Sequence, residues 1–107
     1  QLGAIDAKIM ISRNFLLNTA EAWSNKRDRK KLVPYVIAAK RDASETGVYV
    51  TDVVMRLVGG IGLERQNEFE RLFRDARSGL INPPIEARAL ESIAESALTN
   101  KNNDFLL

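Results

Sequence analysis

The chain of 107 residues contains no cysteine and no histidine. Without thiols it can form neither disulfides nor thiolate sites, and without imidazoles it lacks the base of a Ser-His-Asp triad and the ligands of a Cys/His zinc site. Any acid or base within the chain must therefore be Asp, Glu, Lys or Tyr. The lack of cysteine fits a reducing compartment, and we expect a cytoplasmic protein.

Strong net charge and long apolar runs are also missing. The chain has 16 Lys and Arg against 14 Asp and Glu, a net charge of +2, which attracts a polyanion only weakly at long range. The one basic cluster, Lys26 to Lys31, has no interleaved aromatics to stack on bases, so we expect a solvated turn and no nucleic-acid partner. No apolar run approaches the roughly 20 residues of a membrane span, and the first residues do not resemble a signal peptide.

Apolar residues recur at the spacing of amphipathic helices. Over the first 23 residues they repeat at steps of three, four and seven, which is the period of a helix with one apolar face. This apolar stripe consists of Leu2, Ile5, Ile9, Leu16, Ala20 and Trp23, widened by Met10 and Leu17. Because no cap precedes Leu2, we expect the natural chain to extend further upstream.

A second long helix is predicted from about Pro34 to Gly59. Proline suits the first helical turn, where its missing N–H is not needed, and glycine is typical just after a helix end. The segment Val48–Thr51 has strand propensity, but the apolar residues around it keep the helical phase and there is no second strand run for it to pair with. We therefore expect one helix throughout, forming an antiparallel hairpin with the first.

Two shorter helices follow. Asn67 is a predicted N-cap with a carboxylate three residues on, so a helix should cover Glu68–Arg77 and be closed by Gly79. The pair Pro83-Pro84 fits the beginning of a last helix, which ends at about Leu98.

The predicted fold is all-α, an up-and-down bundle of two long antiparallel helices and two short C-terminal helices, in a single domain over residues 1–107. A two-helix hairpin buries only part of each apolar stripe, so the remainder must be covered by the short helices or by another chain. We expect partner subunits.

The segment that follows the second helix holds three glycines within four positions, Gly59, Gly60 and Gly62. Glycine tolerates positive φ and lets another group approach the main chain closely. This pattern is typical of a helix C-cap with a following turn, and equally of a backbone that receives a phosphate-bearing ligand. The motif alone does not decide between the two interpretations.

The run from Lys40 to Leu98 resembles the C-terminal helical domain of the acyl-CoA dehydrogenase family. The resemblance lies in a long helix that contains Ala38-Ala39-Lys40, the turn Gly59-Gly60-Ile61-Gly62, and then Phe69 to Arg77 with its Arg-Asp pair before a closing helix. Gln1 to Trp23 is similar to the preceding helix of the same domain. The combined order is fairly specific and covers most of the chain.

The resemblance implies a four-helix bundle that follows a helical and a β-domain in one flavoprotein, which binds FAD and oxidises acyl-CoA thioesters at the α,β carbons. This chain lacks those domains and the first helix of the bundle, so we expect no activity from it alone. The family suggests a homo-oligomer, dimer or tetramer, with an electron-transfer partner for the intact protein in fatty acid metabolism. It also implies that Gly59, Gly60 and Gly62 lie near the FAD of a neighbouring subunit.

Two positions depart from the family pattern. Arg56 stands where a glutamine is common, and its guanidinium can still pair with the FAD pyrophosphate. Many members have a catalytic Glu eight residues after the Asp of the Arg-Asp pair, but counting from Asp75 gives Pro83, which cannot abstract a proton. Glu86 is the nearby substitute, although the register argues against it. We assign no catalytic residue and no metal ligand to this chain.

Two alternatives stay open at this point. The chain can be a non-catalytic helical oligomerisation or interaction module, or part of a flavin-dependent monooxygenase on the same fold. Arg74 and Asp75 are expected to be structural, since most ion pairs in helical proteins are. Lys40 is expected to be solvated or ion-paired.

Overall fold

The computed structural model describes residues 1–25, 29–60, 64 and 68–99. They form four α-helices in the order α1 (Leu2–Asn25), α2 (Val33–Val58), α3 (Glu68–Arg77) and α4 (Glu86–Thr99), with 3-10 turns η1 (Lys30–Leu32) and η3 (Ser78–Leu80). There is no strand among these residues, and Val48–Thr51 lies within α2. The predicted all-α class and the four helices are confirmed.

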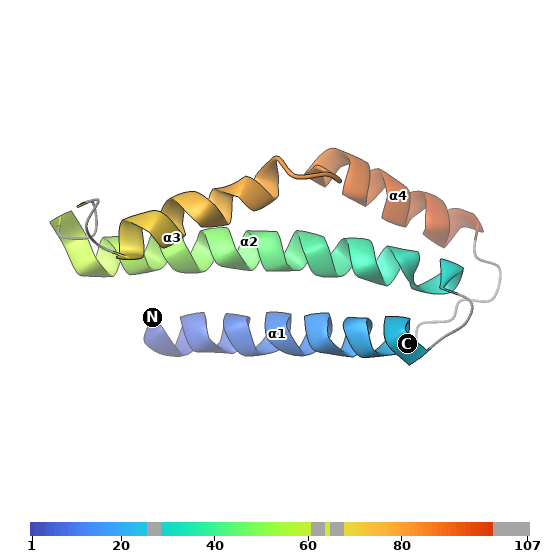
Figure 1. Ribbon diagram of the computed structural model, residues 1–107, viewed down its shortest axis with the longest axis horizontal. Helices are drawn as coiled ribbons and strands as arrows, with labels where there is room; N and C mark the ends of the chain where they lie inside the picture. The colour runs from blue at the N-terminus through green and yellow to red at the C-terminus, as the bar shows by residue number, and fades with distance from the viewer. Residues whose placement is uncertain (26–28, 61–63, 65–67, 100–107) are drawn as a thin grey trace.

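The helix α2 is the central element of the fold (Figure 1). The helix α1 runs antiparallel to it on one side, while α3 and α4 follow one another along the opposite side. The molecule is accordingly elongated, 52 Å by 25 Å by 22 Å. The predicted hairpin of two long helices is present, and the two short helices cover α2 rather than α1.

The ends of α2 follow from local chemistry. Pro34 lies in its first turn, as predicted, and Gly59 ends it with φ 76° and ψ −151° while its N–H donates to the carbonyl of Met55. That backbone conformation is accessible essentially only to glycine. The predicted cap Asn67 lies outside the described residues, although α3 begins at the expected Glu68.

The apolar stripe of α1 does not point mainly at α2. The buried positions of α1 are Ile5, Ser12 and Thr19, seven residues apart, and the hydroxyl of Thr19 donates to the carbonyl of Phe15 at 2.8 Å. Of the predicted stripe only Ile5 is buried. Several of its larger members stay exposed, namely Leu2, Ile9, Met10, Leu16 and Leu17. Part of the apolar surface that the hairpin leaves uncovered therefore lies on α1.

Where the chain passes from α3 into η3, Gly79 lies close against α2. A Cβ built on Gly79 would come within 2.7 Å of the Ser44 hydroxyl and 3.2 Å of its Cβ. The helix was expected to cover Glu68–Arg77 and to be closed by Gly79. The helix α3 does end at Arg77, but the chain continues as a 3-10 turn with Gly79 in its middle. Glycine is therefore required here for close packing on α2 rather than as a helix cap.

Replacing Gly79 by alanine should destabilise the fold by about 1–3 kcal/mol, the usual cost of forcing extra volume into a packed contact. Gly47→Ala is the matched control, because a Cβ there meets Ala76 at an ordinary 3.7 Å and a mid-helix Gly→Ala change stabilises by about 0.5–1 kcal/mol. Urea unfolding of the three proteins measures both effects. Equal midpoints for wild type and G79A would contradict the packing role.

Candidate functional site

The predicted cofactor positions gather at the C-terminal end of α2. Arg56 lies in the last turn and Gly59 and Gly60 follow it, all exposed. No described heavy atom lies within 4 Å of a Cβ built on either glycine. Gly59 has a positive φ, which favours glycine. Gly60 has neither a positive φ nor a described neighbour that would exclude a side chain. The third predicted glycine, Gly62, lies outside the described residues.

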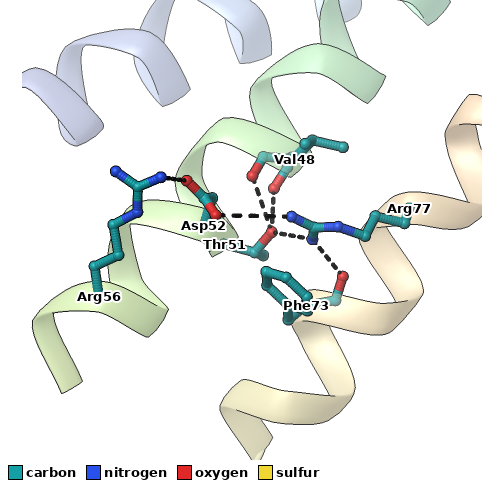
Figure 2. Close-up of polar contacts among 7 residues, drawn as sticks. Val48, Thr51, Asp52, Arg56, Phe73 and Arg77 are labelled. Atoms are coloured by element: carbon teal, nitrogen blue, oxygen red, sulfur yellow. Dashed lines mark hydrogen bonds and ion pairs between the residues drawn. The ribbon is translucent and has the colours of Figure 1, made fainter. Parts of the chain in front are cut away.

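The guanidinium of Arg56 is oriented by Asp52 (Figure 2). Its Nη2 lies 3.1 Å from Asp52 Oδ2, one helical turn earlier, and 79% of the Arg56 side chain remains exposed. The other carboxylate oxygen, Asp52 Oδ1, lies 4.0 Å from Nη2 of Arg77 on α3. The Asp52 carboxylate thus lies between two arginines from different helices. Of these two arginines, only Arg56 exposes most of its side chain to solvent.

Arg77 is held in place by several further contacts. It donates to the Phe73 carbonyl at 2.8 Å, reaches the Thr51 hydroxyl at 3.5 Å, and its guanidinium carbon lies 3.3 Å from the centroid of the Phe73 ring. Thr51 in turn donates to the Gly47 carbonyl at 2.7 Å. Cation–π and hydrogen-bond contacts of this kind fix a guanidinium, so Arg77 joins the last turn of α3 to α2, about two helical turns before Gly59.

A second polar cluster lies further back along α2, at the segment between α3 and α4. The ammonium of Lys40 donates to three main-chain carbonyls, those of Gly79 at 2.7 Å, Asn82 at 2.9 Å and Pro84 at 3.0 Å. The expectation that Lys40 is solvated or ion-paired is wrong. The three N–H groups of the Lys40 ammonium each donate to one carbonyl. These carbonyls follow the end of α3 and accept no hydrogen bond within an α-helix.

Glu86, the proposed substitute base, is engaged in an ion pair. Its Oε1 accepts from Arg41 Nη2 at 2.8 Å and Nε at 3.2 Å, and the same Nη2 lies 3.0 Å from Glu45. Pro83 is exposed on the connecting segment. Arg41 and Arg56 are separated by roughly 22 Å at about 1.5 Å per residue, so the structure does not bring Glu86 to the glycine turn.

Two hollows between the described residues are open grooves, of about 540 Å³ at the beginning of α1 and of about 390 Å³ between the beginning of α2 and the end of α4. A smaller one, bordered by Lys40, Gly79, Pro84 and Glu86, has a volume of about 30 Å³, which is room for about two water molecules. No group of Asp and Glu in this part of the chain is arranged to hold a metal ion, and no described helix is long and apolar enough to cross a membrane.

Sequence reasoning missed Asp52 and Arg77. The pair of Asp52 and Arg56 has the i,i+4 spacing that a sequence can show, whereas the pair of Asp52 and Arg77 joins two helices and has no sequence signature. The same reasoning correctly treated Arg74 as structural, since its Nε lies 2.7 Å from Glu70 Oε1 within α3.

Gly59→Ala should cost about 1–3 kcal/mol of folding stability, because alanine is strained at this φ and ψ. Gly60→Ala, one residue further on, should leave stability nearly unchanged, because its Cβ would enter open space at an ordinary φ. Thermal unfolding of the two variants measures the difference. A G60A variant as unstable as G59A would show that Gly60 is also held in a glycine-only conformation.

The sequence was also compared with known proteins. The family described as "Acyl-CoA dehydrogenase, C-terminal domain" matches residues 1–99. The chain is 33% identical over 95 residues to the Bacillus subtilis (strain 168) protein named "Putative acyl-CoA dehydrogenase YdbM". That match covers 89% of this chain but only 25% of the relative, so the chain spans about a quarter of the relative's length. No solved structure matches significantly. The chain therefore belongs to the acyl-CoA dehydrogenase family, in which it corresponds to the C-terminal helical domain.

Proposed function

We propose that the intact protein is an FAD-dependent enzyme that oxidises acyl-CoA thioesters at the α,β carbons, and that this chain is its C-terminal bundle. The observation that carries the proposal is the end of α2, where an exposed guanidinium lies one turn from a main chain that no described atom covers. Bound FAD would supply the hydride acceptor. The residues of this chain would contribute binding contacts.

Arg56 has the chemistry of a pyrophosphate ligand. A guanidinium forms short, paired hydrogen bonds to phosphate oxygens, stronger than those of an amide. Asp52 holds the Arg56 guanidinium at 3.1 Å, which reduces the side-chain freedom that would be lost on binding. Most of the Arg56 surface nevertheless stays open to a neighbouring subunit.

The glycines beside Arg56 support the same assignment. Gly59 has a structural reason to be glycine, but Gly60 has none in the described structure. A close approach by a group from outside the chain, such as the cofactor held by a second subunit, would supply that reason. The residues present therefore fit the cofactor, with Arg56, Gly59 and Gly60 nearest to it and Gly62 as a further contact.

Proton abstraction from the acyl chain requires a base outside this chain. Pro83 has no basic group. The Glu86 carboxylate accepts two hydrogen bonds from Arg41 on α2. A catalytic base must lie within hydrogen-bond reach of the proton that it removes. We place it in the part of the intact protein that precedes this domain.

Assembly is the second contribution that we propose. The exposed large apolar residues of α1 form a surface suited to burial in a dimer or tetramer. The intact enzyme would work in fatty acid metabolism in the cytoplasm and pass its electrons to a separate electron-transfer partner.

The main alternative is a non-catalytic oligomerisation module, which the loss of the base at Pro83 favours. A flavin-dependent monooxygenase on the same fold would differ from the dehydrogenase in using oxygen in place of an electron-transfer partner.

The first test is the visible absorbance of the purified intact protein under anaerobic conditions, before and after adding acyl-CoAs of different chain lengths. The dehydrogenase should show an oxidised flavin band near about 450 nm that bleaches with at least one acyl-CoA. Bleaching only after another reductant, followed by oxygen consumption, would favour the monooxygenase. A colourless protein that still assembles would favour the interaction module.

In the intact protein, Arg56→Ala should weaken FAD binding by about tenfold or more, because it removes a charge-assisted hydrogen bond. Gly60→Val should also lower FAD retention, because its side chain would hinder a close approach of the cofactor. Arg88→Ala is the matched control, because Arg88 is equally exposed and pairs with Glu91 at 3.3 Å on α4. The ratio of flavin to protein absorbance after gel filtration gives the result. Equal flavin content in all three variants would contradict the site at the end of α2.

A further inference from the structure

One side of α1, next to the side that faces α2, carries exposed apolar residues with two opposite charges among them. The apolar side chains are between 40% and 76% exposed, and both charged residues are exposed as well. On a helix with 3.6 residues per turn, these positions fall within about one third of the circumference. We call them the α1 face, which consists of Leu2, Asp6, Ile9, Met10, Arg13, Leu16 and Leu17.

The two charges of the α1 face have no partner among the described residues. Neither Asp6 nor Arg13 forms an ion pair or a hydrogen bond with another residue of this part of the chain. They lie seven residues apart, beyond the i,i+3 and i,i+4 spacing at which charges on one helix are neighbours. A partner for each must come from outside α1.

The apolar residues of the α1 face are symmetrical about its midpoint. On one edge, Leu2 and Leu16 each lie seven residues from Ile9. When a helix packs antiparallel against a second copy of itself about a two-fold axis, each residue lies opposite the one equally far beyond the axis. With the axis beside Ile9, Leu2 of each copy lies opposite Leu16 of the other, and the two Ile9 side chains meet.

The other edge of the face fits the same axis. Gly3 and Leu17 each lie seven residues from Met10, so Leu17 of one copy comes opposite Gly3 of the other. Gly3 has no side chain, and no described heavy atom lies within 4 Å of a Cβ built there. The groove of about 540 Å³ at the beginning of α1 lies at this place and is lined by Leu2, Gly3, Ile5, Asp6 and Ile9. Leu16 and Leu17 of the second copy would fill it.

The charges select the antiparallel direction. The same axis brings Asp6 of each copy opposite Arg13 of the other, so that two ion pairs form across the contact. In a parallel pair Asp6 would face Asp6 and Arg13 would face Arg13, and like charges that face each other repel. A single axis therefore matches both apolar edges and both charges.

We propose that α1 is a self-recognition surface, through which two copies of the protein associate antiparallel about a two-fold axis beside Ile9 and Met10, with reciprocal ion pairs between Asp6 and Arg13. This inference deepens the assembly role proposed above and rests on it. It does not depend on the binding of FAD.

The first experiment is cysteine cross-linking in the intact protein, since this chain has no cysteine of its own. Ile9→Cys lies beside the axis, so mild oxidation should link two copies into a dimer on a non-reducing gel. Ile11→Cys is the matched control, because Ile11 is 69% exposed but lies outside the α1 face. Oxidised wild type controls for cysteines elsewhere in the intact protein.

The direction of the pair is tested in the same way. Leu2→Cys alone should not link, because the two copies of Leu2 lie at opposite ends of the contact. Leu2→Cys combined with Leu16→Cys should link. A parallel pair would instead link Leu2→Cys alone, and that result would overturn the proposal.

The second experiment reverses the charges in the Ile9→Cys protein. Asp6→Arg and Arg13→Asp should each slow cross-linking by about tenfold or more, because like charges then face each other across the axis. The double variant D6R/R13D restores opposite charges and should return to within about twofold of the parent rate. Such a rescue requires contact between copies, since the two residues do not pair within one chain.

Sedimentation of the intact wild type separates this inference from the assembly role. An oligomer in which Ile9→Cys links no faster than Ile11→Cys, or in which the double charge variant links as slowly as the single ones, would overturn this inference alone. Another part of the intact protein would then cover the α1 face. A wild type that sediments as a monomer would overturn the assembly role and this inference with it, whereas the FAD site is judged by flavin content.

Discussion

The contact between the Lys40 ammonium and three main-chain carbonyls is the interaction on which the C-terminal half of the fold most depends. It joins α2 to residues 39 to 44 positions further along the chain. The buried apolar side chains of the described residues are few, namely Ile5, Leu32, Ala39 and Ala89. Because the apolar core is so small, the half-buried contact of Lys40, with all three of its N–H donors satisfied, contributes much to fixing residues 79–84 in one position on α2.

The rigidity of α2 connects this contact to the rest of the candidate site. A continuous helix of 26 residues keeps Lys40 and Arg41 at a constant distance from Arg56 and the glycines. Two sets of polar contacts lie along it in order. Lys40 and Arg41 come first and contact residues 79–86, and Asp52 follows near its end, where it contacts Arg56 and, on α3, Arg77 (Figure 2). The helices α3 and α4 therefore each have their own ion pair with α2, Arg77 with Asp52 for α3 and Glu86 with Arg41 for α4.

The sequence predicts what depends on neighbouring residues. Helical periodicity, Pro34 at the start of α2 and Gly59 at its end all act over one or two turns, and the structure has them where they were expected. The partners of Lys40 are main-chain carbonyls, which every residue has, so no sequence pattern marks them. Gly79 resembles a helix stop, but its reason is the nearness of Ser44. The proposed cofactor role of Arg56 and Gly60 would depend on a second subunit, and contacts between chains leave no local pattern in the sequence of one chain.

The central position of α2 has a consequence for how substitutions combine. The helix α1 and the pair α3 and α4 lie on opposite sides of α2 (Figure 1), so α2 is the helix that the others share. Energetic coupling between residues requires contact or a shared partner. Changes on α1 should therefore add to changes on α3 or α4 in free energy where they contact different residues of α2, and evolution can alter the outer faces of the domain independently while α2 stays constrained from both sides.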